Sequence, residues 1–193
     1  MSHTLHPFLV GDRVYLRPVE SEDLPSICTW ANDPETRKLT GEVLPMSMKK
    51  ANEFLEKIQE DKERVWFSVV LKENDRLIGE AGLLRMFYPW RTTDLTLIIG
   101  EKDCWGKGYG TEAIHLLLDY AFGYLNFHRV AVGVVGFNEN ALHFYEKVGF
   151  KKEGAQRDGY YYNHTYYDFV MMSILEDEYK RLQSHKSNKN KNC

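Results

Sequence analysis

A glycine-rich segment, residues 105–111, has the residue types and the position that a protein chain uses to bind an anion. Gly106, Gly108 and Gly110 stand at alternate positions, and glycine lets the backbone approach a ligand closely. An apolar run at 95–99 predicts a strand before the segment, and apolar residues spaced by three and four predict a helix after it. Because a helix N-terminus offers unpaired N–H groups and a partial positive charge, the segment predicts a site for a diphosphate.

Two familiar phosphate-binding motifs fit this segment poorly. An ATP-type loop has four residues between its first glycine and Gly-Lys, and Ser or Thr follows. Here five residues separate Gly100 from Gly106 and Lys107, and glycine follows. The dinucleotide fingerprint matches the glycine spacing better, but it requires an acidic residue about 20 positions on, and none lies between Asp119 and Glu139. Because the glycine spacing matches, a nicotinamide-dependent enzyme is kept as a rival interpretation. After ATP and the dinucleotides, coenzyme A is the third class of ligand that such a segment can bind.

A second motif favours coenzyme A. After a predicted strand at 130–135, residues 138–150 follow the pattern N-x-x-A-x-x-x-Y-x-K-x-G-F. Together with the glycine segment, this pattern resembles the GCN5-related N-acetyltransferases from about residue 14 to residue 175. Within that family the chain is most similar to the branch of spermidine N-acetyltransferases and ribosomal-protein alanine N-acetyltransferases. One departure is Trp105, which stands where the family often has Gln or Arg.

The resemblance implies an α/β fold in one domain. We expect a mixed, twisted, mostly antiparallel sheet with helices on both faces and two central parallel strands, 95–99 and 130–135, that splay apart. The acetyltransferase domain is expected at 13–179, after a loose lead-in at 1–12. A basic, disordered tail is expected at 180–193 because Lys and Arg alternate there with Ser and Asn.

The resemblance also implies acetyl-CoA as the acetyl donor, with its pantetheine arm between the splayed strands. A backbone N–H near Ile98 would bind the oxyanion, and Asn138 would contact the arm or cap the following helix. The residues that this assigns to cofactor binding are Ile98, Ile99, Gly100, Trp105, Gly106, Lys107, Gly108, Tyr109, Gly110, Thr111 and Asn138.

Tyr145 is the expected general acid, because the matching tyrosine of the family directs its hydroxyl at the sulfur. Alternatively, Tyr145 is a core residue on the buried face of the predicted helix and has no catalytic role. Full proton transfer from tyrosine, with a pKa of about 10, to a thiolate of pKa about 8.5 is uphill by roughly 2 kcal/mol. Glu80 is a candidate base, although its position between Gly79 and Ala81 favours a side chain that faces solvent or forms a structural pair. Asp94 and Glu101 are further candidates for that role.

The acceptor should be a primary amine, which is almost entirely protonated at neutral pH because its pKa is near 10.4. Asp33, Glu35 and Glu42 lie in a turn-rich segment and are candidates for attracting the cation, unless they are simply solvated. A polyamine such as spermidine is favoured, and a protein N-terminus or another small amine is an alternative. We expect direct attack in a ternary complex. The rival interpretation is a noncatalytic acyl-CoA-binding or sensor domain.

Local patterns predict the remaining elements. A strand is expected at 14–18 and a helix from Glu22 and Asp23 through Trp30. After the turn-rich stretch 33–46, a second helix is expected to begin at Ser47 and Met48. Two hairpins complete the prediction, one formed by 66–71 and 77–86 and an aromatic-rich one at 160–169 with its turn near Asn163 and His164.

Composition limits the function classes further. The 193 residues have a formal net charge of −3, which gives no sign of nucleic-acid or membrane partners. The chain has neither a basic-then-apolar leader nor an apolar run of about 20 residues, so we expect a cytoplasmic protein. Three cysteines without metal-ligand spacing predict neither a zinc site nor a disulfide framework, and Cys104 is more simply a loop thiol than an acetylated intermediate. Homodimers are common in the family that the chain resembles, so a homodimer is a possible assembly.

Overall fold

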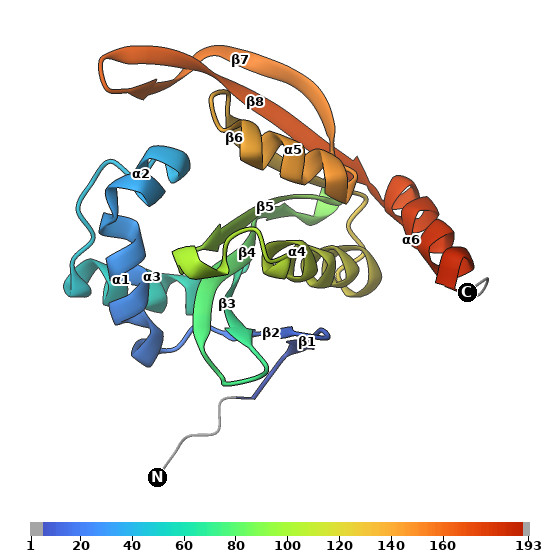
Figure 1. Ribbon diagram of the computed structural model, residues 1–193, viewed down its shortest axis with the longest axis horizontal. Helices are drawn as coiled ribbons and strands as arrows, with labels where there is room; N and C mark the ends of the chain where they lie inside the picture. The colour runs from blue at the N-terminus through green and yellow to red at the C-terminus, as the bar shows by residue number, and fades with distance from the viewer. Residues whose placement is uncertain (1–5, 191–193) are drawn as a thin grey trace.

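One eight-stranded sheet runs through the protein and is covered by helices on both faces (Figure 1). The computed structural model describes residues 6–190. Along the sheet the order is β1-β2-β3-β4-β5-β6-β8-β7, and only β5 and β6 run parallel, which confirms the predicted fold class. The strands are β1 (Leu9–Val10), β2 (Val14–Pro18), β3 (Val65–Leu71), β4 (Leu77–Phe87), β5 (Thr92–Ile99), β6 (Arg129–Val135), β7 (Lys151–Tyr162) and β8 (Thr165–Leu175).

The parallel pair β5 and β6 stays together over a short distance only. Thr92, Thr93 and Asp94 lie opposite residues 129–131, and the register between the two strands ends there within the described chain. Beyond Asp94 each strand keeps its outer neighbour, β4 for β5 and β8 for β6. The two strands therefore splay apart toward their C-terminal ends, as predicted.

Two apolar cores lie on opposite faces of the sheet. The larger one contains α4 (Tyr109–Asp119), whose apolar face packs on β2, β4 and β5. α5 (Glu139–Val148) adds Tyr145 and Val148 to the same core. On the other face α1 (Leu24–Asn32) and α3 (Met48–Glu60) form the smaller core with Trp66 of β3. α1 and α3 are thus held on the other side of the sheet from the glycine segment, which precedes α4.

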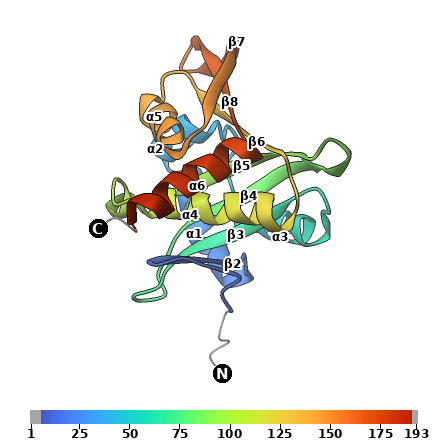
Figure 2. The ribbon, with the colours of Figure 1, turned by 90° about the vertical axis from the view of Figure 1, so that its right-hand side faces the viewer.

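The last two strands form a long hairpin that extends beyond the rest of the sheet (Figures 1 and 2). The predicted aromatic hairpin is confirmed, and it is longer than the sequence indicated because β7 begins at Lys151. Asn163 and His164 form its turn with positive φ angles of 47° and 64°. Tyr160 donates from its hydroxyl to the carbonyl of Lys38, at 2.9 Å, so the hairpin contacts the segment that follows α1 in the chain.

Three segments differ from the prediction. The turn-rich stretch 33–46 contains α2 (Pro34–Thr40), which begins at the N-cap Asp33 and ends at Gly41 with φ of 80°. The lead-in 1–12 contains β1, which pairs with β2, and residues 1–5 lie outside the described chain. The expected disordered tail is helical through residue 190 as part of α6 (Glu176–Asn190), and residues 191–193 lie outside the described chain.

Specific contacts explain why α6 forms. Its first turn is acidic, which suits a helix N-terminus, and Lys180 pairs with Glu176 one turn earlier at 2.5 Å. Tyr179 is buried and donates to Asp119 of α4 at 2.8 Å, so α6 packs beside the end of α4 (Figure 2). Tertiary anchoring of one turn thus overrides a polar composition that favoured disorder.

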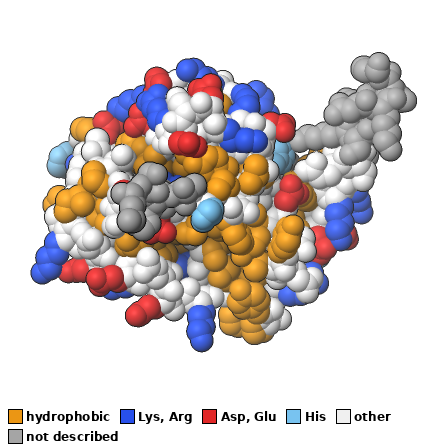
Figure 3. Space-filling model, turned by 90° about the horizontal axis from the view of Figure 1, so that it is seen from below, with side chains coloured by type: hydrophobic (Ala, Val, Ile, Leu, Met, Phe, Trp, Pro, Cys, Tyr) orange, Lys and Arg blue, Asp and Glu red, His pale blue; other side chains and the backbone are white. Residues whose placement is uncertain are grey.

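Hydrophobic side chains gather on the face of the molecule seen from below (Figure 3). Aromatic contacts among the described residues link Phe8 to Tyr120 and Tyr120 to Tyr124, with ring centroids 5.4 and 6.0 Å apart. Phe8 and Tyr124 are exposed. Of the helices between residues 6 and 190, none is long and apolar enough to cross a membrane.

Candidate active site

Two cavities meet where β5 and β6 separate. The smaller, of about 410 Å³, lies on the side of α1, α2 and α3, and the larger, of about 990 Å³, extends along the glycine segment. Eight residues of α2, β5 and α5 line both and mark their junction: Thr36, Leu39, Thr40, Leu97, Ile98, Asn138, Ala141 and Tyr145. A ligand in one cavity can therefore meet a ligand in the other at the splay point.

The glycine segment forms the wall of the larger cavity and begins α4. Gly106 and Gly108 have φ angles of 71° and 84°, a region that favours glycine, and Gly108 is the N-cap of the helix. Gly106, Gly108, Gly110 and Thr111 line the cavity. In the chain between residues 6 and 190, the main-chain N–H groups of 106–111 have no protein acceptor. These free donors fit a diphosphate.

Two residues assigned to the cofactor from the sequence have their side chains outside both cavities, although their main-chain N–H groups are among the free donors. Neither Lys107 nor Tyr109 lines either cavity. The carbonyl of Lys107 accepts from Arg13 at 2.9 Å, and the Tyr109 ring lies under the Arg13 guanidinium at 5.0 Å. The segment therefore has a cofactor side, formed by its glycines, and an outer side held by Arg13.

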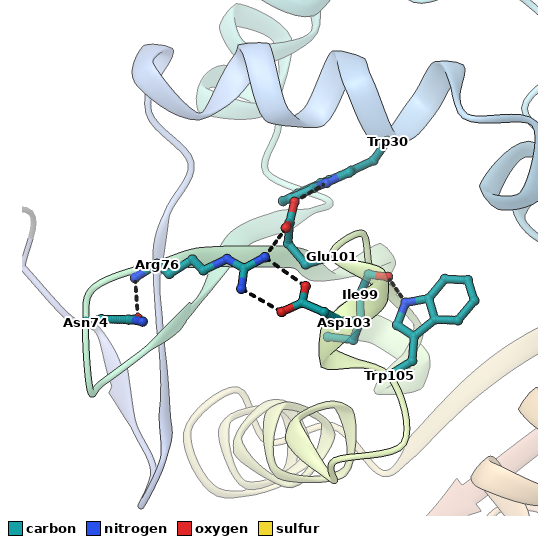
Figure 4. Close-up of polar contacts among 7 residues, drawn as sticks. All are labelled: Trp30, Asn74, Arg76, Ile99, Glu101, Asp103 and Trp105. Atoms are coloured by element: carbon teal, nitrogen blue, oxygen red, sulfur yellow. Dashed lines mark hydrogen bonds and ion pairs between the residues drawn. The ribbon is translucent and has the colours of Figure 1, made fainter.

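A polar network fixes the loop between β5 and the glycine segment (Figure 4). Glu101 accepts from the Trp30 indole at 3.0 Å and from Arg76, and Arg76 makes two 2.8 Å bonds to Asp103. Trp105, which lines the larger cavity, donates from its indole to the carbonyl of Ile99 at 2.6 Å. Because Glu101 is fully engaged in this network, it is poorly placed to act as a base.

Main-chain geometry shows which groups of β5 face the gap. The N–H of Gly100 donates to Ile78 of β4 at 2.9 Å, and strand alternation directs the groups of Ile98 to β4 as well. The main-chain groups of Leu97 and Ile99 then point toward the gap between β5 and β6. An oxyanion in that gap would meet the N–H groups of Leu97 and Ile99 rather than that of Ile98. Gly100 lines neither cavity; a Cβ there would lie 2.0 Å from Trp30, so its role is packing.

Tyr145 lies on α5 at the junction of the two cavities and is 6% exposed. Burial raises the pKa of Tyr145 above its usual range, so the hydroxyl stays protonated at neutral pH. It can donate a hydrogen bond to a developing thiolate, while complete transfer of its proton becomes less favourable than for a solvated tyrosine. Both interpretations of Tyr145, core residue and cavity residue, therefore apply to the same side chain.

Asn138 has two uses at once. Its side-chain oxygen caps α5 by accepting from the N–H of Ala141 at 3.1 Å. The residue also lines both cavities, and the capping bond uses only the oxygen of the amide. The side-chain nitrogen is left to donate to a ligand.

Glu80 is a buried carboxylate on β4 and lines the smaller cavity. It does not face bulk solvent, and among the described side chains it forms no ion pair; the indole of Trp66 donates to it at 2.8 Å. Burial raises the pKa of Glu80, and the bond from Trp66 opposes that rise. Glu80 lies opposite Ile98 in the sheet, so it is one strand away from the splay point.

The other acids have different surroundings. Glu42 lines the smaller cavity, whereas Asp33 lines neither and caps α2 by accepting from Glu35 and Thr36. Lys102 pairs with Asp33 at 3.0 Å and with Glu35 at 2.9 Å, so the two carboxylates share one positive charge. Hydrogen bonds from Thr36 and Lys102 hold the pKa of Asp33 below its usual range.

Asp94, the last base candidate, is engaged at the surface. It forms an ion pair with Arg85, whose side chain is 76% exposed, and it lines neither cavity. Only Glu80 and Glu42, of the six acids singled out from the sequence, line the smaller cavity.

Several cavity residues had no recognisable signal in the sequence. The smaller cavity has aromatic walls contributed by Trp30, Phe54, Trp66 and Phe169, which come from four different elements. α2 contributes Thr36, Leu39 and Thr40 to both cavities. The pair Asp33 and Pro34 was a usable signal, because Asp at an N-cap followed by Pro begins helices.

Cys104 lines the larger cavity and is buried. Burial raises the pKa of its thiol, which disfavours the reactive thiolate. No group of three or more His, Cys, Asp or Glu side chains that could hold a metal ion occurs among residues 6–184, whose side chains the structure describes.

Comparisons with known proteins identify the family. The family model described as an acetyltransferase (GNAT) domain matches residues 13–151. An uncharacterized N-acetyltransferase, p20 of Bacillus licheniformis, is 29% identical over 174 residues, which cover 89% of this chain and 97% of p20.

Two solved structures are similar throughout. The crystal structure of spermidine N-acetyltransferase from Vibrio cholerae in complex with CoA and spermine has 30% identity and a TM-score of 0.82, and the match covers 88% of this chain and 99% of that one. A dodecameric structure of the Vibrio cholerae enzyme has 30% identity and a TM-score of 0.76, with 88% and 97% covered. This chain therefore belongs to the GCN5-related N-acetyltransferase family and is an acetyl-CoA-dependent acetyltransferase.

Proposed function

We propose that the protein transfers acetyl from acetyl-CoA to a primary amine by direct attack in a ternary complex, and that a polyamine such as spermidine is the preferred acceptor. The observation that carries the proposal is the junction of the two cavities at Tyr145, Asn138 and Leu97. The similarity to spermidine N-acetyltransferases supports a polyamine as the acceptor, and so do the two carboxylates, Glu80 and Glu42, in the smaller cavity. A protein N-terminus or another small amine is the alternative acceptor.

The donor would lie in the larger cavity. Free N–H groups of 106–111 would bind its diphosphate, and Asn138 and the main chain of Leu97 and Ile99 would hold the pantetheine arm. An N–H of β5 would stabilise the oxyanion, which is a large catalytic term in acyl transfer. Because Trp105 already occupies the carbonyl of Ile99, the arm would use the N–H of that residue.

The acceptor would lie in the smaller cavity with its amine near Glu80. Glu80, directly or through water, would take the proton of the ammonium, and the neutral nitrogen would attack the thioester carbon. As the C–S bond breaks, the sulfur takes the electron pair, and the hydroxyl of Tyr145 donates a hydrogen bond and then its proton. The extra proton that the attacking nitrogen still carries would pass through water to the tyrosinate, which leaves a neutral amide, a free thiol and a neutral Tyr145. The aromatic walls, including Trp66, would stabilise the cation of the bound amine by cation–π contact.

The experiment is turnover of acetyl-CoA with spermidine, spermine, N-terminal peptides and aminoglycosides as acceptors. Tyr145→Phe should lower kcat by about 10²-fold or more while leaving CoA affinity unchanged, since general acids contribute about that much. Tyr161→Phe, at an exposed position of the β7–β8 hairpin, is the matched control. Binding of CoA with no thiol release on any amine would instead support a noncatalytic acyl-CoA sensor.

We infer at least a homodimer because a related structure is dodecameric. Analytical ultracentrifugation at micromolar concentration tests this, and a monomer would contradict it. The predicted cytoplasmic location would be tested by cell fractionation.

A further inference from the structure

Arg13 holds the outer side of the glycine segment. It belongs to the turn between β1 and β2, and its Nη1 donates to the carbonyl of Lys107 at 2.9 Å. Its Nε donates to Glu112 at 3.2 Å, and Glu112 also accepts from the main-chain N–H groups of Arg13 and Val14, at 2.7 and 3.1 Å. The bond from Arg13 to Lys107 joins residues 94 positions apart in the chain.

The bond to Lys107 determines the direction of one donor. The carbonyl of Lys107 and the N–H of Gly108 belong to the same peptide unit, which is trans. In a trans peptide these two groups point in opposite directions. Because the carbonyl points to Arg13 on the outer side, the N–H of Gly108 points inward, and Gly108 lines the larger cavity.

The charge of Arg13 also strengthens that donor. A guanidinium bonded to a carbonyl polarises the peptide, and hydrogen bonds arranged in a chain reinforce one another. Glu112 and the Tyr109 ring keep the guanidinium in place, since they contact it from two further directions. A Cβ on Gly108 would lie 3.1 Å from Nη2, so the arginine lies directly against the turn.

We propose that Arg13 is a positioning residue for the donor, which aims and polarises the N–H of Gly108 toward the diphosphate of acetyl-CoA through the carbonyl of Lys107. The inference rests on the proposed placement of the diphosphate. It assigns a role in cofactor affinity to a residue that lines neither cavity and lies at the start of the sheet, far from the glycine motif in sequence.

The test compares acetyl-CoA, which has a diphosphate, with S-acetylpantetheine, which lacks it. Arg13→Gln should lower kcat/KM about tenfold for acetyl-CoA, mostly through KM, because a hydrogen bond to a charged group contributes about that factor. With S-acetylpantetheine, which has the same thioester but no diphosphate, Arg13→Gln and the native protein should give the same kcat/KM. The KM for the amine should not change.

Two further variants sharpen the comparison. Arg64→Gln removes an arginine that pairs with Asp61 at the end of α3, away from both cavities, and should leave both donors unaffected. Arg13→Lys keeps the charge and should recover part of the loss. It also replaces Arg13→Gln in the test if that variant fails to fold.

Equal losses with both donors would overturn the proposal, because a general structural defect would not depend on the diphosphate. No loss with acetyl-CoA would overturn it as well. If the native protein turns over no amine, the proposed function fails, and the inference is then judged by calorimetry of CoA binding. In that case Arg13→Gln should weaken CoA binding about tenfold relative to Arg64→Gln, and equal affinity would reject the inference.

Discussion

Glu80→Gln should lower activity and raise stability at neutral pH at the same time. The carboxylate is buried, and the indole N–H of Trp66 donates to it at 2.8 Å. A glutamine has nearly the same shape and keeps an oxygen that can accept this bond. The substitution therefore removes the charge and the basicity of the side chain with little change in packing.

The stability effect follows from the direction of the pKa shift. Burial raises the pKa of Glu80 in the folded protein above the value of about 4.3 that glutamate has in an unfolded chain. Between the two values the folded state binds more protons, so the free energy of unfolding falls as pH rises through that window. Glu80→Gln does not titrate. Its stability relative to the native protein should increase from pH 4 upward and then level off above the raised pKa.

The activity effect has the opposite sign. A general base contributes about 10² to 10⁴ in rate, so kcat with the best amine should fall by about 10²-fold or more. In the native protein, kcat/KM should fall as pH decreases through the raised pKa of Glu80, because a protonated carboxyl cannot accept a proton. The assays are urea unfolding and steady-state turnover, both measured from pH 4.5 to 8.5.

A matched control is Glu53→Gln, an exposed acid on α3 that lies 3.9 Å from Lys49. It should change neither turnover nor the pH dependence of stability. Retention of kcat within about twofold in Glu80→Gln would refute the role of Glu80 as base. Lower stability than the native protein at pH 8 would refute the argument from burial.

Two further substitutions test the framework of the acceptor side. Asp23→Asn should cost about 3–5 kcal/mol in urea unfolding because it leaves the buried Arg17 charge without its 2.6 Å partner, and a loss below about 1 kcal/mol would contradict this. Burial raises the pKa of Asp23, but bonds from Arg17 and Ser68 outweigh it and lower the pKa, so native stability should also be lost as pH falls through that low value. Gly100→Ala should cost about 1–3 kcal/mol and raise the KM of the amine by displacing Trp30 into the smaller cavity; unchanged amine kinetics with unchanged stability would reject the packing role assigned to Gly100.

The cofactor side could be predicted from the sequence because its signals are local. Alternate glycines between an apolar strand and an amphipathic helix require particular backbone conformations, and Gly106 and Gly108 have them. The cap at Asn138 and the helix stop at Gly149, with φ of 118°, are equally local. What the pattern could not show is which side of each strand or turn lines a cavity: Lys107, Tyr109 and Gly100 line neither, although the N–H groups of Lys107 and Tyr109 are free.

The acceptor side could not be predicted in the same way because long-range partners determine what its acids do. Asp33 and Glu35 both pair with Lys102, and the bond from Lys102 to Asp33 joins residues 69 positions apart. Asp33 serves two helices, as the C-cap of α1 and the N-cap of α2, so the turn-rich appearance of 33–46 hid the second helix. Residues close in sequence to a motif were therefore better determined than residues brought to it by folding.

The pairing of Lys102 also changes how acceptor selectivity should arise. Lys102 engages Asp33 and Glu35, neither of which lines the smaller cavity, and the carboxylates that do line it are Glu80, which is buried, and Glu42. The rest of the wall is largely aromatic and aliphatic. Exposed carboxylates attract any cation and are screened by salt, whereas a buried carboxylate among aromatic rings favours an amine attached to a hydrocarbon chain. Selection among amines should therefore depend on the shape of the chain that carries the amine more than on its total charge.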